Sequence, residues 1–336
     1  MLKNIAEKTG VSISTVSRAL AGKPGVSAKK QKEILEIARK CGIMPSRAAS
    51  YLRTGRRSGV KIIVNYGRTR ISAMREHELI NMAEKEFGYV ETGVCAEEGD
   101  VESQAREAVS AGNSGIIFCG DTLRISPETT AMLRKKKIPF VSIGAESETF
   151  DSLLINRAAG TRQIAKLFIH TKKTRPVYFS FCNCKNPDDR LKGIISACEE
   201  EEAPAPELFH PAGSDIENAY FAARELFSTV PCDALFAYSD TMAIGALRAV
   251  HELGLRVPED VSIAGMDGIP ECAYLSPSLT TVVQPVAEAA REAINLLKNR
   301  LSYPECAKQT KKLDTKLFLR ETTTQINPEI MKKIYQ

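Results

Sequence analysis

Hydrophobic residues at the start of the chain recur at helical spacing around a single glycine. In residues 4–18, NIAEKTGVSISTVSR, Ile5 is apolar on a first helix, Gly10 permits a sharp turn, and Val16 falls on the inner face of a second helix. Ser12 is well suited to cap the start of that second helix. The pattern predicts a helix-turn-helix, although an ordinary surface hairpin of two helices has the same spacing.

Two further helical elements are expected before the first strand. Ser27 can cap a third helix over residues 28–41, and Gly42 ends it, so that three helices share one small core. Ser46 can then cap a short helical segment over residues 47–53. Because a helix of about seven residues is marginal in water, we expect it to form against a second copy of itself, against DNA or against both; the alternative is a plain linker.

After these helices, short β-branched runs alternate with amphipathic stretches. The first series places strands at 60–64, 89–94, 115–119 and 139–143 and helices around 74–87, 102–111 and 127–136. The second series places strands at 176–181, 234–238 and 261–265 and helices at 157–170, 189–200, 216–227 and 240–253. A helix at 286–301 and a strand near 316–319 follow. The alternation is typical of doubly wound parallel sheets, and two series predict two lobes with a cleft between them.

Positive charge is concentrated at one end of the chain. The first 58 residues contain thirteen Lys or Arg and three Glu, a net charge of +10, whereas the remainder contains 33 Lys or Arg and 38 Asp or Glu. A small basic module on a mildly acidic body is typical of a protein that binds nucleic acid, because neutralising phosphates supplies most non-specific affinity. A solvated basic surface is the alternative.

Composition and missing motifs predict which features the protein lacks. The 336 residues suffice for two or three domains, and nine scattered Cys suit a reducing compartment. Cys182 and Cys184 are interpreted as buried strand packing rather than a metal site. No leader or apolar run of about twenty residues occurs, so we expect a cytoplasmic protein without membrane contact. Phosphate-cradling and nucleophile motifs are missing, so no enzyme and no cofactor are expected.

Two N-terminal motifs resemble those of a known family. GVSISTVSRAL at residues 10–20 and PSRAASYLRTGR at residues 45–56 are similar to the headpiece and hinge of the LacI/GalR family of bacterial transcription repressors. A helix-turn-helix places the start of its second helix against base edges, so Ile13 and Ser14 are the candidate sequence readers. The resemblance implies that Leu52 enters the minor groove between base pairs. The residues expected to contact a pseudo-palindromic operator in double-stranded DNA are Ile13, Ser14, Thr15, Ser17, Arg18, Ser27, Arg47, Ala49, Leu52 and Arg53.

The C-terminal half carries a longer motif of the same family. SDTMAIGALRAVHELGLRVPEDVSIAGMDG at residues 239–268 and PSLTTVVQP at residues 277–285 are similar to its effector domain. The resemblance implies a two-lobed core like that of periplasmic binding proteins, and a stand-alone sugar-binding protein would lack the headpiece. We expect a headpiece at 1–45, a hinge and linker at 46–58, a core at 59–325 and a polar tail at 326–336. The N-lobe is expected at about 59–155 and 285–312, and the C-lobe at about 156–284 and 313–325.

Candidate effector contacts lie at strand ends. Ligands of open α/β sheets bind at the carboxyl ends of the strands, which selects Ser239, Asp240 and Asp267. By resemblance, Arg190 and Asp267 match the family's paired effector-binding Arg and Asp, which suits sugar hydroxyls. A structural Arg190–Asp267 ion pair, and helix capping alone by Asp240, are the alternatives. Gln284 lies where the chain crosses back to the first lobe and is the expected hinge.

The loop after the first expected strand contains Arg68 and Arg70, at the edge of the cleft. Together with Arg190 they can bind oxyanions, which leads to the hypothesis that the effector is an anionic sugar derivative. Simple solvent exposure of both arginines is the alternative. By resemblance, the lobes close on the effector and shift the interface of a homodimer, in which each headpiece reads one half-site.

Overall fold

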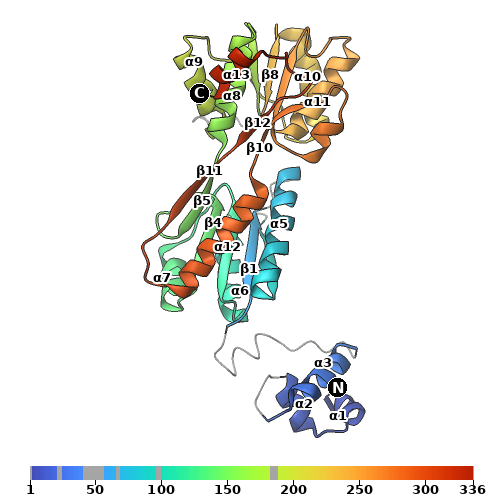
Figure 1. Cartoon of the computed structure of the whole chain (residues 1–336), viewed down its shortest axis with the longest axis vertical. Helices are drawn as coiled ribbons and strands as arrows, with labels where there is room; N and C mark the ends of the chain where they lie inside the picture. The colour runs from blue at the N-terminus through green and yellow to red at the C-terminus, as the bar shows by residue number, and fades with distance from the viewer. Residues whose placement is uncertain are drawn as a thin grey trace.

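The structure is a computed structural model that describes residues 2–20, 25–40, 57–65, 69–95, 100–181 and 188–335. Three bodies follow one another along its long axis: a helical headpiece, an N-lobe and a C-lobe (Figure 1). Within the described ranges, no helix is long and apolar enough to cross a membrane. Several residues singled out in the sequence lie outside these ranges, namely Arg47, Ala49, Leu52, Arg53, Arg68, Cys182 and Cys184.

The headpiece consists of three short helices around one small core. They are α1 (Leu2–Thr9), α2 (Ile13–Leu20) and α3 (Ala28–Lys40). Ile5, Val16 and Ile34 are fully buried, so each helix contributes an apolar residue to the centre. Gly10 has a φ of 65°, a left-handed conformation that favours glycine and turns α1 sharply into α2. This geometry confirms the predicted helix-turn-helix.

The N-lobe is built on a six-stranded sheet in which all neighbouring strands are parallel. In spatial order the strands are β11 (Thr310–Asp314), β5 (Asp151–Asn156), β4 (Phe140–Gly144), β3 (Gly115–Gly120), β1 (Val60–Asn65) and β2 (Val90–Cys95). Successive side chains of a strand point to opposite faces, so Ile62 packs in one core layer and Ile63 in the other. The first layer is covered by α5 (Arg70–Phe87) and α12 (Val286–Ser302), and the second by α6 (Asp100–Ala111) and α7 (Pro127–Lys135).

The C-lobe repeats this architecture. Its six strands, in spatial order, are β12 (Lys316–Phe318), β10 (Thr280–Val283), β9 (Ser262–Asp267), β8 (Ala234–Ala237), β6 (Pro176–Phe179) and β7 (Glu207–Phe209). Only the edge strand β12 is antiparallel to its neighbour among the described pairs. One face is covered by α10 (Ile216–Thr229) and α11 (Asp240–Glu252), and the other by α8 (Arg157–His170), α9 (Asp189–Glu200) and α13 (Pro328–Tyr335).

The described chain passes between the lobes at three crossings: from β5 into α8, from β10 into α12, and from β11 into β12. Thr315 joins two of them, because its hydroxyl donates to the Asn156 carbonyl at 2.9 Å and accepts from the Gly160 N–H at 3.1 Å. A Cβ on Gly160 would lie 2.2 Å from a Val282 methyl. The crossings are therefore packed tightly against one another.

The predicted fold class is confirmed, with two doubly wound parallel sheets behind a helical headpiece. The alternation did not predict β5, β7, β10 or β11. The edge strand β11 has the sequence TKKLD and is mostly exposed, so it lacks the apolar run by which buried strands are recognised. Because β11 ends at Asp314, the N-lobe sheet extends past the expected boundary at residue 312.

The C-terminal segment corrects another expectation. Residues 326–336 were expected to form a polar tail, but α13 packs against α8 and its Ile334 is fully buried in the C-lobe core. The Tyr335 hydroxyl also donates to the Leu317 carbonyl at 3.0 Å. The apolar residues Ile330 and Ile334 are four apart and share one helix face, a short amphipathic signal that the polar composition obscures.

We therefore expect Ile334→Ala to lower the free energy of unfolding by about 2–4 kcal/mol, since it removes buried methyl groups and leaves a cavity. The matched control is Met331→Ala on the same helix, where the side chain is 38% exposed and little should change. Urea unfolding of the full-length variants measures both. Equal, small losses would show that α13 does not stabilise the C-lobe.

Candidate DNA-binding and effector sites

The second headpiece helix presents a polar face to solvent. Ser14, Ser17 and Arg18 are exposed, while Val16 on the opposite side of α2 is buried. Ile13 is apolar yet 48% exposed at the start of the helix. An exposed apolar side chain beside hydroxyls and one guanidinium can combine thymine-methyl contact with hydrogen bonds to bases and phosphates.

Ser12 fixes the end of the helix that carries these residues. Its Oγ accepts a hydrogen bond from the Thr15 N–H at 3.1 Å and lies 2.8 Å from the hydroxyls of Ser14 and Thr15. Ser27, which is exposed, lies at the start of α3 with its Oγ 3.4 Å from the Lys30 amide nitrogen. The cap that the sequence predicts at Ser12 is present and orients the first turn of α2.

A cavity of about 530 Å³ lies between the lobes. Its N-lobe wall comes from the end of β1 and the first turns of α5, and its C-lobe wall from the starts of α10 and α11 and from the loop after β9. Apolar side chains such as Ile216, Ile244 and Ile269 alternate with polar ones such as Asn65 and Thr241. A mostly apolar wall with a few polar groups is typical of a small-molecule site.

Asp267, at the end of β9, is the centre of a buried polar cluster. Its Oδ1 accepts a hydrogen bond from the Gln284 amide at 2.6 Å and lies 4.0 Å from an Arg190 nitrogen. The Arg190 guanidinium also stacks on the Tyr238 ring, 3.9 Å from its centroid. The structure thus brings together the predicted residues Arg190, Asp267 and Gln284, from α9, β9 and the second crossing.

The environment of Asp267 is strained electrostatically and conformationally. Burial raises the pKa of Asp267 to about 7, against the opposing effect of Arg190 and with a further increase from the nearby Asp240. Its φ of 127° is one that L-residues rarely adopt. Backbone strain of this kind costs on the order of 1–3 kcal/mol and is found mainly at functional sites.

Two further arginines tie the N-lobe to this region. Arg75 on α5 donates a hydrogen bond to the side-chain amide oxygen of Gln284. Arg157, at the start of α8, pairs with Asp121 after β3 at 2.5 Å. Although burial opposes it, the guanidinium groups of Arg157, Arg75 and Arg190 lower the pKa of Asp121. The guanidinium groups of Arg75, Arg157 and Arg190 therefore lie near two carboxyl groups. Asp121 is stabilised as a carboxylate, whereas burial favours the neutral form of Asp267.

The two residues at the start of α11, Ser239 and Asp240, both have hydrogen-bond partners within the C-lobe. Asp240 is fully buried, and its carboxylate accepts hydrogen bonds from the Gly268 and Ile269 amides at 2.6 and 2.9 Å and from the Thr281 hydroxyl at 2.5 Å. Ser239 is the residue that caps α11, through the Met242 N–H at 3.2 Å. Asp240 anchors the loop after β9. Effector contact by Ser239 and Asp240 stays a prediction; like Arg190 and Asp267, they are not among the residues that line the cavity.

Arg70 lies on the cavity wall but is already paired. Its Nε donates to a Glu271 oxygen at 3.0 Å, across the gap from the N-lobe to the C-lobe. Both side chains are about half exposed, so the pair is screened by solvent and contributes little to stability. Arg70 is thus not simply solvent-exposed, and it would have to break its ion pair with Glu271 to bind an anion.

Sequence reasoning missed Arg75, Asp121, Arg157 and Glu271. Asp121 follows the carboxyl end of β3, so the strand-end rule that selected Asp267 also applies to it. Arg157 follows β5, which the hydrophobic pattern did not predict. Arg75 and Glu271 carry no sequence signal, because their positions depend on how the two lobes meet. In the described residues, no group of His, Cys, Asp and Glu is arranged to hold a metal ion.

Both the headpiece and the core of the chain match families of known proteins. Residues 1–46 match the model of bacterial regulatory proteins of the lacI family, and residues 158–323 match the periplasmic binding protein-like domain. The chain is 25% identical over 338 residues to the probable HTH-type transcriptional repressor ExuR of Bacillus subtilis, covering 97% of this chain and 98% of that one.

Solved structures have the same fold. The lac repressor dimer bound to operator and the anti-inducer ONPF superposes with a TM-score of 0.73 at 20% identity, over 96% of this chain and 98% of that one. A LacI-family regulator from Enterococcus faecium with bound ribose gives a TM-score of 0.69 at 22% identity, over 80% of this chain and 100% of that one. The chain therefore joins a DNA-binding domain of the lacI family of bacterial regulatory proteins to a periplasmic binding protein-like domain.

Proposed function

We propose that the protein is a sequence-specific transcriptional repressor whose affinity for operator DNA is changed by a sugar-like effector bound between its lobes. The exposed face of α2 on a basic headpiece supports DNA reading. The cavity between the lobes and the buried polar cluster of Arg190, Asp267 and Gln284 support effector binding. The similarity to the probable repressor ExuR over nearly the whole chain, and to the operator-bound lac repressor, supports the same function.

The buried polar cluster of Arg190, Asp267 and Gln284 is called the effector cluster below. The observation that carries the proposal is that Gln284 connects both lobes at this cluster. An effector that binds Arg190 and Asp267 changes the contacts of Gln284 and, through Arg75, the position of α5. A shift of the N-lobe then alters how two headpieces meet DNA. Because such coupling is reciprocal, bound operator must change effector affinity by the same factor.

A homodimer is part of this proposal. One headpiece reads one half-site, and a pseudo-palindromic operator presents two half-sites related by a two-fold axis. A two-fold dimer places two copies of α2 in register with such a site. The related lac repressor is a dimer in its operator complex.

The charges around the cluster support an anionic sugar derivative as effector. The Nε atoms of Arg157 and Arg190 are buried and have no hydrogen-bond partner among the described residues. Guanidinium donors in this state suit a carboxylate or phosphate, which accepts two parallel hydrogen bonds. Because the Nε atoms of Arg157 and Arg190 lack partners, whereas that of Arg70 donates to Glu271, we assign anion binding to Arg157 and Arg190 in preference to Arg70.

We expect the double exchange Ile13→Ser and Ser14→Ile to change which operator the protein selects from a pool of random duplexes, because both side chains lie at the exposed start of α2. Effector affinity in the absence of DNA should stay unchanged, which provides the internal control. If the exchanged protein selects the wild-type operator, the base-reading positions lie elsewhere.

Calorimetry with matched pairs of neutral hexoses and their uronates tests the effector class. We expect the uronate to bind at least about tenfold more tightly, since one charge-assisted hydrogen-bond pair contributes about 1.5–3 kcal/mol. Arg190→Gln should remove this preference, whereas Arg70→Gln should keep it. Tighter binding of the neutral sugar would contradict an anionic effector.

Stability should depend on pH through Asp267. Its pKa of about 7 in the fold exceeds the ordinary value, so the stabilisation from the neutral carboxyl is complete near pH 4 and is lost as the pH rises to about 7. The effector-free wild type should therefore lose at least about 1 kcal/mol relative to Asp267→Asn between about pH 5 and pH 8. Urea unfolding at each pH measures the difference. A difference independent of pH would show that Asp267 ionises normally.

A further inference from the structure

Four consecutive cations stand at the end of α7. Arg134 and Lys135 form the last turn of the helix, and Lys136 and Lys137 follow it. All four side chains are exposed, and in the described part of the chain none of them has an acidic partner within ion-pair distance. We call residues 134–137 the basic edge.

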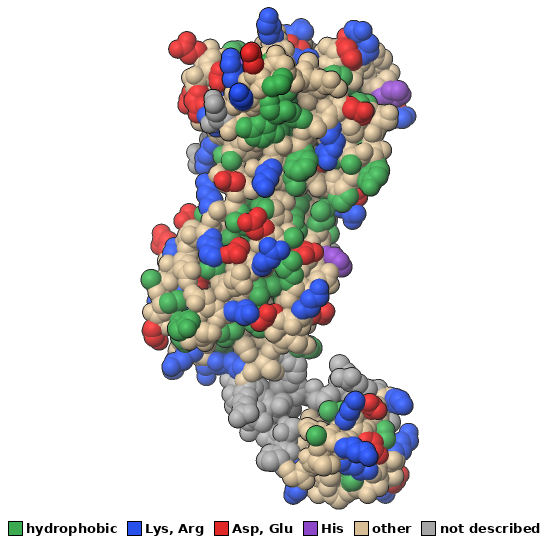
Figure 2. All heavy atoms as spheres, in the orientation of Figure 1, with side chains coloured by type: hydrophobic (Ala, Val, Ile, Leu, Met, Phe, Trp, Pro, Cys, Tyr) green, Lys and Arg blue, Asp and Glu red, His purple; other side chains and the backbone are tan. Residues whose placement is uncertain are grey.

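The topology places the basic edge on the side of the N-lobe that faces the headpiece. In a parallel sheet each helix runs back against the strands, so the end of α7 lies at the amino edge, where β4 and β1 begin. Arg57, just before β1, donates a hydrogen bond to the Lys136 carbonyl. The last residues before the sheet therefore touch the basic edge, and Figure 2 shows Lys and Arg side chains gathered at this end of the N-lobe.

The charge of the basic edge is opposite to that of the core around it. Residues 59–336 contain 33 Lys or Arg and 38 Asp or Glu, and a surface of that sign repels DNA. Glu148 and Glu305 line the same cavity as Arg134 and Lys137 and offset part of the charge there. Lys135 and Lys136 lie outside that cavity lining. A helix C-terminus favours cations, but only within its last turn, which does not account for Lys136 and Lys137.

We propose that the basic edge binds the phosphate backbone of DNA that flanks the operator half-site. This inference rests on the proposed DNA-binding function and adds a second, sequence-independent contact from the core. Charge complementarity supports it, as does the continuity of the edge with the chain segment that leads to the headpiece. Long cationic side chains act on phosphates within about 8–10 Å at physiological ionic strength.

The test compares two lengths of DNA. The full-length protein selects its operator from a random duplex pool, and the operator is then prepared as about 18 bp, covering two half-sites, and as about 40 bp with flanks. The variant is Arg134→Gln with Lys135→Gln. The control is Lys332→Gln with Lys333→Gln, which also removes two exposed cations from the last turn of a helix, α13. That helix lies in the C-lobe, the body farthest from the headpiece (Figure 1).

Wild-type affinity for the long duplex should fall more steeply with salt than affinity for the short one. On the long duplex, the slope of log affinity against log salt concentration should be shallower by about 2–4 for the Arg134/Lys135 variant. Each phosphate contact contributes about 0.9 to this slope, and a dimer carries two copies of the variant site. Its slope on the short duplex, and both slopes of the control variant, should match the wild type. Equal melting temperatures confirm that all three proteins are folded.

Other outcomes overturn the proposal separately from the function. If the wild-type slope is the same on both duplexes, or if the variant loses equally on both, the basic edge does not contact flanking DNA. If the control loses as much as the variant, net charge alone explains the effect. Failure of the wild type to select any operator contradicts the proposed function and, with it, this inference.

Discussion

The Gln284 amide is the interaction on which the arrangement of the core depends. Its nitrogen donates to Asp267 of the C-lobe, and its oxygen accepts from Arg75 of the N-lobe. A primary amide is suited to this position because it satisfies a carboxylate and a guanidinium at once without adding charge. Since Gln284 lies at a crossing, the lobes cannot rotate without changing one of these two hydrogen bonds. The same side chain, Gln284, therefore forms part of the hinge between the lobes and part of the buried polar cluster.

Asp240 and Asp267 show how the same chemical group acquires different roles. Burial raises the pKa of both carboxyl groups, and the nearby Asp240 raises the pKa of Asp267 further. Asp240 is surrounded by two backbone amides and the Thr281 hydroxyl, so it holds the loop after β9 in place. Asp267 retains a strained backbone and only the Gln284 amide and a distant Arg190. A buried carboxyl that is incompletely paired gains most from a ligand that donates hydrogen bonds, which is why the effector is assigned to Asp267.

How far the sequence predicted this structure depends on the range of the interactions involved. The headpiece helices depend on local capping and turn residues, so Ser12 and Gly10 predicted them correctly. Arg190 and Asp267 came together as expected, because strand ends and a family motif identify them. The cross-lobe partners, Arg75 with Gln284 and Arg157 with Asp121, were missed because nothing local relates them. The hydrogen bonds of Asp240 were missed for the same reason, because its partners Gly268 and Thr281 are distant in sequence.

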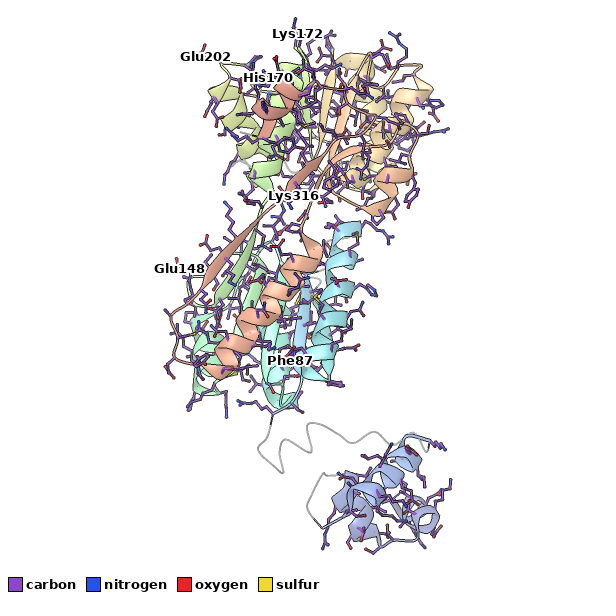
Figure 3. The ribbon with its side chains drawn as sticks, viewed as in Figure 1. Phe87, Glu148, His170, Lys172, Glu202 and Lys316 are labelled. Atoms are coloured by element: carbon purple, nitrogen blue, oxygen red, sulfur yellow. The ribbon has the colours of Figure 1, made fainter. Side chains whose placement is uncertain are left out.

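The parallel sheet of the N-lobe separates its two proposed functions in space. All strands point the same way, so the carboxyl edge faces the cavity while the amino edge faces the headpiece. β1 joins the two edges in six residues, about 20 Å, from the end of the linker to Asn65 on the cavity wall. α5 runs in the opposite direction over 18 residues, about 27 Å, from Arg70 at the cavity to Phe87, labelled in Figure 3 toward the headpiece end. Because both elements pack in one buried core layer, their side chains cannot rearrange independently. A change at the effector cluster therefore reaches the DNA side as a rigid-body movement of the N-lobe rather than as local unfolding within it.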